Sequence, residues 1–155
     1  MAKEIERKFA VSDPGIIAGR MGALIVQGYI ADEPMTVRVR IMNAEAFMTL
    51  KCRTNGIERD EYEFPIPMHH ARELLDKYCR GRVIEKTRYR IPHSGQVFEV
   101  DEFGGKLMGL MIAEVELDKA EQAIELPDWI GVELTHDCRF SNSALSLLEQ
   151  APEAR

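Results

Sequence analysis

The sequence predicts an α+β fold dominated by antiparallel strands, in the number needed for an eight-stranded antiparallel β-barrel, with a few peripheral helices. Three observations lead to this prediction. Six segments alternate in polarity with a period of two residues, which is typical of half-buried strands. Short turn signals separate these segments and favour antiparallel neighbours over crossover connections. Few segments show helical periodicity.

The expected strands can be placed in chain order. Clear alternation covers residues 3–11, 36–42, 47–53, 59–66, 83–91 and 97–103. Two further segments complete a set of eight, because residues 24–31 are apolar enough for a largely buried strand and residues 110–118 alternate in their later half. Glycine, asparagine, aspartate and proline mark the turns between them.

The expected helices are short. Residues 68–79 repeat apolar side chains at three- and four-residue spacing, which predicts a helix with one packing face. Ser12 or Asp13 could cap a short helix near the N-terminus, and Ser141 or Asn142 could cap another near the C-terminus.

Composition and charge limit the class of protein. The 155 residues fit a single domain over residues 1–155, in which we expect residues 151–155 to fray. A net charge of −6 disfavours nucleic acid as a partner. No apolar stretch reaches the length of a membrane span, and the N-terminus is charged where a signal peptide needs an apolar core. We therefore expect a cytoplasmic protein with no membrane association.

The charges of the expected strands are sorted by sign. In KEIERKF, Glu4, Glu6 and Lys8 share one face of a strand, while Ile5 and Phe9 point to the other. The same two-residue spacing recurs in Arg38 and Arg40, Lys51 and Arg53, Glu61 and Glu63, Lys86, Arg88 and Arg90, Glu99 and Asp101, and Glu114 and Glu116. Exposure of one face to solvent would explain such a pattern in a single strand. A face that is only solvated usually carries both positive and negative side chains within one strand, so exposure alone does not explain the whole set.

This sorting suits a site for a metal and a phosphate. Paired carboxylates offer the hard oxygen ligands that magnesium and manganese prefer, and paired Arg and Lys suit phosphate oxygens. In a closed barrel the ionic faces could turn inward and the apolar faces outward, under the helices. Buried charges of this kind are costly unless a ligand completes them, which indicates a function.

The ordered motifs resemble the CYTH superfamily, also called the triphosphate tunnel metalloenzymes. EIERKF matches the E-x-E-x-K signature, and TVRVRI, MTLK, EYEF, EKTRYRI, EVDEF and AEVEL follow in the family's order. The resemblance implies an eight-stranded β-tunnel that binds a small-molecule triphosphate and a divalent metal, Mg2+ or Mn2+. It favours metal-dependent hydrolysis of inorganic tripolyphosphate to pyrophosphate and phosphate.

The resemblance also implies a role for each matching residue. The metal ligands would be Glu4, Glu6, Glu114 and Glu116. The phosphate contacts would be Lys8, Arg38, Arg40, Lys51, Lys86 and Arg88. The catalytic residues would be Lys8, Glu61, Glu63 and Asp101, the three acids as further ligands or groups that position water.

Other functions remain open on the same scaffold. A class IV-type adenylate cyclase or a thiamine or nucleoside triphosphatase would need recognition of the organic group, for which the sequence shows no obvious pocket. A non-catalytic polyphosphate- or nucleotide-binding module would not need the acidic residues, which repel phosphate unless a metal is present. The chain could act as a monomer or a homodimer.

Overall fold

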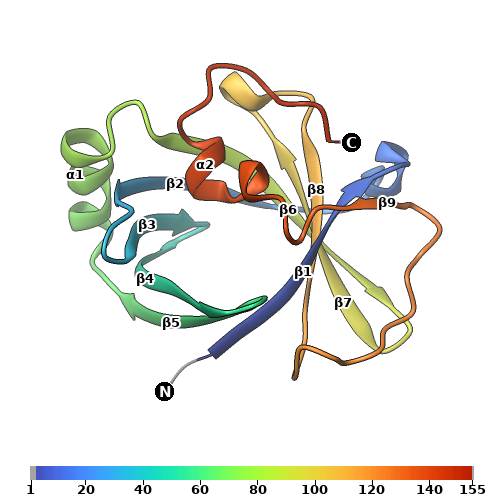
Figure 1. Ribbon diagram of the computed structural model, residues 1–155. Coiled ribbons are helices and arrows are strands. Elements are labelled where there is room, and N and C mark those ends of the chain that lie inside the picture. Colours follow the sequence, from blue (N-terminus) through green and yellow to red (C-terminus); the bar gives the residue numbers. More distant parts are fainter. Residues whose placement is uncertain (1–2, 155) are drawn as a thin grey trace.

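Eight antiparallel strands close into a barrel in the computed structural model, which describes residues 3–154 apart from the side chains of residues 53–55 (Figure 1). The strands are β1 (Lys3–Val11), β2 (Ala23–Ala31), β3 (Thr36–Met42), β4 (Glu45–Asn55), β5 (Glu58–Pro65), β6 (Val83–His93), β7 (Gln96–Phe103) and β8 (Met111–Glu116). They are hydrogen-bonded in the order β5-β4-β3-β2-β6-β7-β8-β1, and pairing of β1 with β5 closes the ring. The predicted fold class is confirmed.

A ninth strand, β9 (Ile130–Glu133), was not predicted from the sequence. On one edge of β1, β5 pairs only with Lys3 to Ile5, and β9 pairs with Phe9 and Val11 further along the same edge. β9 therefore supplies hydrogen-bond partners where β5 diverges from β1. Four residues are too few to show a period of two.

The helices differ in length from the prediction. α1 (Met68–Tyr78) matches, whereas the N-terminal segment forms only the 3-10 turn η1 (Pro14–Ile17). The short helix expected there is thus a single 3-10 turn, because glycines interrupt the segment, and Gly19 has a φ of 74°. Two more 3-10 turns are η2 (Gly105–Leu107) and η3 (Cys138–Phe140), and α2 (Asn142–Leu145) follows the latter.

The caps partly follow the sequence. The Asp13 carboxylate accepts a hydrogen bond from Gly15 N at 3.0 Å, and Ser141 Oγ accepts one from Ala144 N at 3.1 Å. Ser141 is thus the cap of α2, one of the two candidates. No helix in the described part of the chain is long and apolar enough to cross a membrane.

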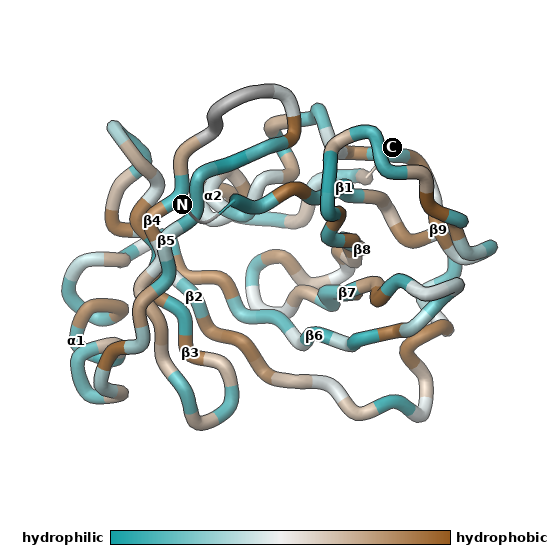
Figure 2. Tube along the Cα trace, turned by 90° about the horizontal axis from the view of Figure 1, so that it is seen from below, coloured by the Kyte–Doolittle hydropathy of each residue, from teal (hydrophilic) through white to brown (hydrophobic). Residues whose placement is uncertain are grey.

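Much of the apolar core lies on the outer face of the barrel. Figure 2 shows hydropathy changing from residue to residue along the strands. α1 covers the outer face of β3 and β4, where Ala71 packs with Val39 and Ala46. The outer face of β7 and β8 is covered by a loop that carries Trp129. The Trp129 ring packs edge-on against the Phe98 ring, with 5.6 Å between the ring centroids. The sequence predicted that helices would cover the apolar outer faces, but a loop without regular secondary structure covers this one.

One end of the barrel interior is apolar. The inward-facing rows end in Ala10, Tyr29, Ile84, Phe103 and Ile112, which pack with Phe140 and Leu145 from the C-terminal region. Ala151 and Ala154, from the segment expected to fray, pack against this cluster, and Arg155 lies outside the described residues. The C-terminal region thereby covers this end of the barrel (Figure 1).

Close packing of α1 on β2 gives a test of the fold. A Cβ on Gly28 would lie 2.6 Å from Cys79 Cβ and 2.8 Å from Leu75 Cδ2, so Gly28→Ala should lower the free energy of unfolding by about 1–3 kcal/mol, measured in urea. Gly104→Ala is the matched control, because its nearest neighbour is 3.9 Å away and its φ is −116°. Equal stability of the two variants would contradict the packing described.

Candidate functional site

The barrel encloses a cavity of about 460 Å³. All of the predicted site residues line it except Lys86, Asp101 and Glu116. Those that do are Glu4, Glu6, Lys8, Arg38, Arg40, Lys51, Glu61, Glu63, Arg88 and Glu114. Because neighbours on a strand point to opposite faces, each pair at two-residue spacing is delivered to the same side of the wall. The ionic faces therefore turn inward.

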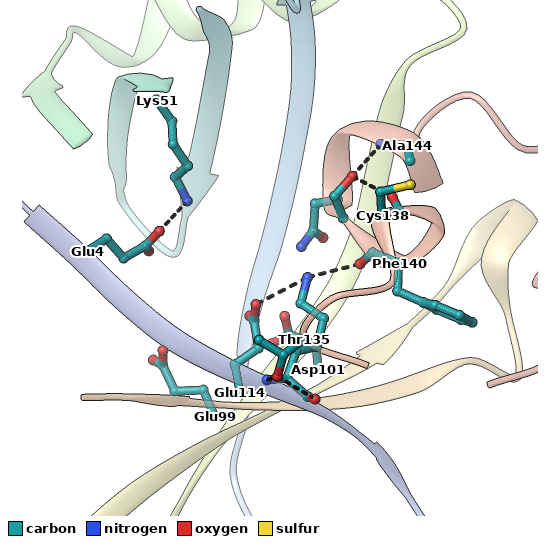
Figure 3. A network of polar contacts seen from close by, with 12 residues as sticks. Glu4, Lys51, Glu99, Asp101, Glu114, Thr135, Cys138, Phe140 and Ala144 are labelled. Carbon is teal, nitrogen blue, oxygen red and sulfur yellow. Dashed lines mark hydrogen bonds and ion pairs between the residues drawn. The ribbon is translucent and has the colours of Figure 1, made fainter. Parts of the chain in front are cut away.

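Lys51 links two acidic strands. Its Nζ lies 2.8 Å from Glu4 Oε2 on β1 (Figure 3). It also lies 3.1 Å from Glu61 Oε2 on β5, so one ammonium on β4 faces carboxylates of two strands. Burial alone would lower the pKa of Lys51, but Glu4 and the other nearby carboxylates outweigh burial and the net shift is upward. The contact to Glu4 Oε2 lacks the geometry of a directed hydrogen bond.

Lys8 and Glu114 meet where β1 pairs with β8. Lys8 Nζ donates to the Phe140 carbonyl at 2.9 Å and lies 3.5 Å from Glu114 Oε2 (Figure 3). Although burial would raise the pKa of Glu114, Lys8 and Arg88 hold it well below its usual range. Glu6 differs, because burial, Glu114 and Glu4 all raise its pKa well above its usual range. Like charges are thus crowded on this wall.

Asp101 is shared by two cations behind the cavity. Arg88 donates from Nε to Asp101 Oδ1 at 2.8 Å and from Nη2 to Asp101 Oδ2 at 2.9 Å. Lys86 Nζ lies 2.7 Å from Asp101 Oδ2. Burial lowers the pKa of Lys86 to about 7, while Lys86 and Arg88 outweigh burial and lower that of Asp101. Asp101 therefore fixes the orientation of Arg88, and the direct roles foreseen for Lys86 and Asp101 stay predictions.

Two arginines of β3 form the basic wall. Arg38 Nη2 donates to Thr49 Oγ1 at 3.1 Å, and its buried Nε has no hydrogen-bond partner among the described residues. Arg40 Nε donates to Gln27 Oε1 at 2.9 Å. Burial, together with Arg38 and Arg88, lowers the pKa of Arg40 to about 10. The repulsion between these guanidinium groups would be relieved by a bound polyanion.

Glu116 lies outside the cavity wall. Its side chain is exposed, unlike that of Glu114 two residues earlier on β8. Burial and the carboxylates of Glu4, Glu99 and Glu61 raise its pKa, so it belongs to the acidic side of the site. Its predicted role as a metal ligand stays a prediction.

The cavity contains residues that the sequence did not single out for the site. Arg59 lines it, and it has the same position in the β5 alternation as Glu61, which was an available signal. Thr49 also lines it and was not recognised because a neutral threonine carries no charge pattern. Asn142 and its two serine neighbours, Ser141 and Ser143, line the wall from the distant C-terminal region, which no strand periodicity could reveal.

The acidic side has the donors for a hard metal ion. Across the described residues, no three carboxylate, histidine or cysteine side chains are grouped as a metal site, because lysine and arginine face the carboxylates instead. The donor chemistry nevertheless fits a divalent cation. Glu4 Oε2 is buried without a directed hydrogen bond, and Glu6 is crowded by Glu4 and Glu114. A divalent cation would relieve this repulsion.

The comparisons with known proteins agree with this geometry. Residues 2–149 match the sequence model of the CYTH domain. The chain belongs to the CYTH family. It is 46% identical over 146 residues to an inorganic triphosphatase from Acetivibrio thermocellus, with 94% of each chain covered. It is 42% identical over 151 residues to an inorganic triphosphatase from Nitrosomonas europaea, with 93% of this chain and 97% of that one covered.

Two solved structures show the same fold. The crystal structure of an inorganic triphosphatase superposes with a TM-score of 0.69 at 38% identity, over 97% of this chain and 99% of that one. A protein from Bacillus halodurans described as a putative adenylate cyclase has a TM-score of 0.62 at 17% identity, over 78% of this chain and 84% of that one. That identity supports the shared fold alone. The family resemblance deduced from the motifs is confirmed.

The raised pKa of Glu6 gives a pH-dependent prediction for the protein in chelator. The Glu6 carboxyl group binds its proton more tightly in the folded protein than in the unfolded protein. The free energy of unfolding therefore falls as pH rises from the ordinary glutamate pKa through the raised pKa of folded Glu6. Glu6→Gln cannot titrate and should be more stable than wild type at pH 7. The difference should shrink as pH falls to about 4, where unfolded Glu6 also becomes protonated.

Urea unfolding of both proteins at several pH values measures this difference. Glu102→Gln serves as control, because Glu102 is exposed on the outer face of β7. A stabilisation by Glu6→Gln that is the same at all pH values would show that Glu6 is not strained by its neighbours.

Proposed function

We propose that this protein hydrolyses inorganic tripolyphosphate to pyrophosphate and phosphate, with Mg2+ or Mn2+ as cofactor. The observation that carries the proposal is one cavity in which crowded cations face crowded carboxylates. A polyphosphate would neutralise the first set and a divalent metal the second. The curated relatives that are inorganic triphosphatases support the same reaction.

The basic wall would bind the phosphate chain together with the other cations of the cavity. Arg38, Arg40 and Arg88 offer planar donor groups that match phosphate oxygens, and Lys8 and Lys51 add compact charges. Asp101 holds Arg88 in place through two hydrogen bonds, so little reorientation is needed when substrate binds. Such fixed cations stabilise charge on the leaving pyrophosphate in the transition state.

The acidic wall would hold the metal. Glu4, Glu6 and Glu114 are the proposed ligands, with Glu116 at the edge of the same side. When bound, a divalent metal polarises a phosphoryl oxygen and neutralises its charge. Glu61 and Glu63 on β5 face this cavity, and we propose that they position the attacking water. Lys8, beside Glu114, would contact the reacting phosphoryl group.

The cavity favours a substrate without an organic group. Tyr29 is the aromatic side chain among the described residues that line it, and its hydroxyl accepts a hydrogen bond from Gln27 while its ring contacts Arg82. A base or thiazole ring would therefore find no free stacking surface there. We further propose that the chain works as one domain, in the cytoplasm, on a small-molecule triphosphate.

Phosphate release from tripolyphosphate, ATP and thiamine triphosphate tests the proposal. We expect rapid release from tripolyphosphate with Mg2+ or Mn2+ and none in chelator. Glu114→Gln should lower kcat/KM at least about 100-fold, because it removes a proposed ligand and unpairs Lys8.

Glu102→Gln should keep wild-type activity, because it makes the same chemical change on the outer face of β7. Faster release from ATP or thiamine triphosphate would reassign the substrate. Binding of tripolyphosphate without release of phosphate from any compound would identify a non-catalytic binding module and contradict the proposed hydrolysis.

A further inference from the structure

A C-terminal strap, defined as residues 138–146, forms one side of the cavity. It contains η3 and α2 and lies against the barrel in Figure 1. Ser141, Asn142 and Ser143 are its cavity-lining residues. The strap carries no cation into the cavity, so it differs from the basic wall.

The strap is fixed on both sides of Asn142. Ser143 Oγ donates to Asp32 Oδ1 at 2.5 Å. Arg82 donates two hydrogen bonds to the same carboxylate, at 2.9 and 3.1 Å, and one to the Ser143 carbonyl at 3.0 Å. On the other side, Ser141 caps the following turn. Asn142 therefore has little freedom in its backbone.

The side chain of Asn142 is oriented by Lys86. Lys86 Nζ lies 3.1 Å from Asn142 Oδ1, and an ammonium can only donate, so the oxygen must face the lysine. The amide nitrogen Nδ2 then points away from Lys86, and it donates to no group among the described residues. Two N–H donors are left on a residue that lines the cavity.

We propose that Asn142 is a triphosphate-binding residue, which donates from Nδ2 to a phosphate oxygen while Oδ1 holds Lys86. The inference rests on the proposed function, because it takes tripolyphosphate as the ligand. A neutral donor suits this position. The neighbouring Lys8 and Lys86 are already buried cations, and a third charge would repel them, whereas an amide adds donors without charge.

Asn142→Asp tests the assignment. This variant keeps an oxygen toward Lys86 but replaces the Nδ2 donor with a second acceptor that repels phosphate. KM for tripolyphosphate should rise at least about 10-fold, as expected for loss of a hydrogen bond to a charged group. The rise in melting temperature produced by saturating tripolyphosphate should shrink in parallel.

Arg139→Gln is the matched control, because it changes the net charge by the same amount within the strap. The Arg139 side chain is 68% exposed and pairs with Asp137, away from the main cavity. Its KM should stay within twofold of the wild-type value. A KM for Asn142→Asp within twofold of that for Arg139→Gln would overturn the inference, as would a loss of kcat with unchanged KM.

The outcomes separate this inference from the proposed function. Wild-type protein that fails to hydrolyse tripolyphosphate contradicts the proposed function, whereas active wild type with an unaffected Asn142→Asp contradicts only the role of Asn142. Circular dichroism confirms that each variant is folded. If Asn142→Asp does not fold, Asn142→Ala replaces it, and the same 10-fold rise in KM is expected because the donor is again absent.

Discussion

Charges of like sign held together inside a closed barrel are the constraint on which the rest of this structure depends. Most small barrels fill their interior with apolar side chains, which supply the stabilising core. Here only one end of the interior is filled in this way, and the rest is ionic. The other apolar residues of the strands are therefore buried on the outer face, where α1 and the loop that carries Trp129 cover them. The peripheral elements are consequences of the site.

The interior reduces its electrostatic cost by pairing charges between strands. Lys51 on β4 faces carboxylates of β1 and β5, and Asp101 on β7 binds two cations of β6. Buried pairs of this kind add little net stability, because desolvation offsets their attraction. Their effect is to fix the geometry. Glu6, Arg40 and Lys86 still have pKa values shifted away from the charged form. Glu6 and Arg40 line the cavity, where a metal and a phosphate would stabilise their charges.

The sequence predicted the barrel and most of the cavity wall because both depend on alternation along single strands. Once Glu4 is known to face inward, Glu6 and Lys8 must do so as well. The depth of a residue depends on how the barrel is sheared, so nothing in the sequence showed that Lys86 would be fully buried while Glu116 stayed exposed. A helix capped by Ser141 was predicted in the strap, but β9 and the place of the strap in the cavity wall were not, because both depend on tertiary contacts.

The two ends of the chain complete the site together. Lys8, from the first strand, donates to the carbonyl of Phe140 across 132 positions of sequence. The next residues of the strap line the cavity and hold Lys86 through Asn142. Because β1 also closes the barrel through its pairing with β5, both the wall and the strap depend on contacts between the first strand and distant parts of the chain. The lysines inside the barrel differ in this respect. Lys51 and Lys86 have carboxylate partners on the neighbouring strand of a hairpin. Lys8, by contrast, reaches the Phe140 carbonyl only when the two ends of the chain meet, so the cost of burying Lys8 is offset only in the complete fold.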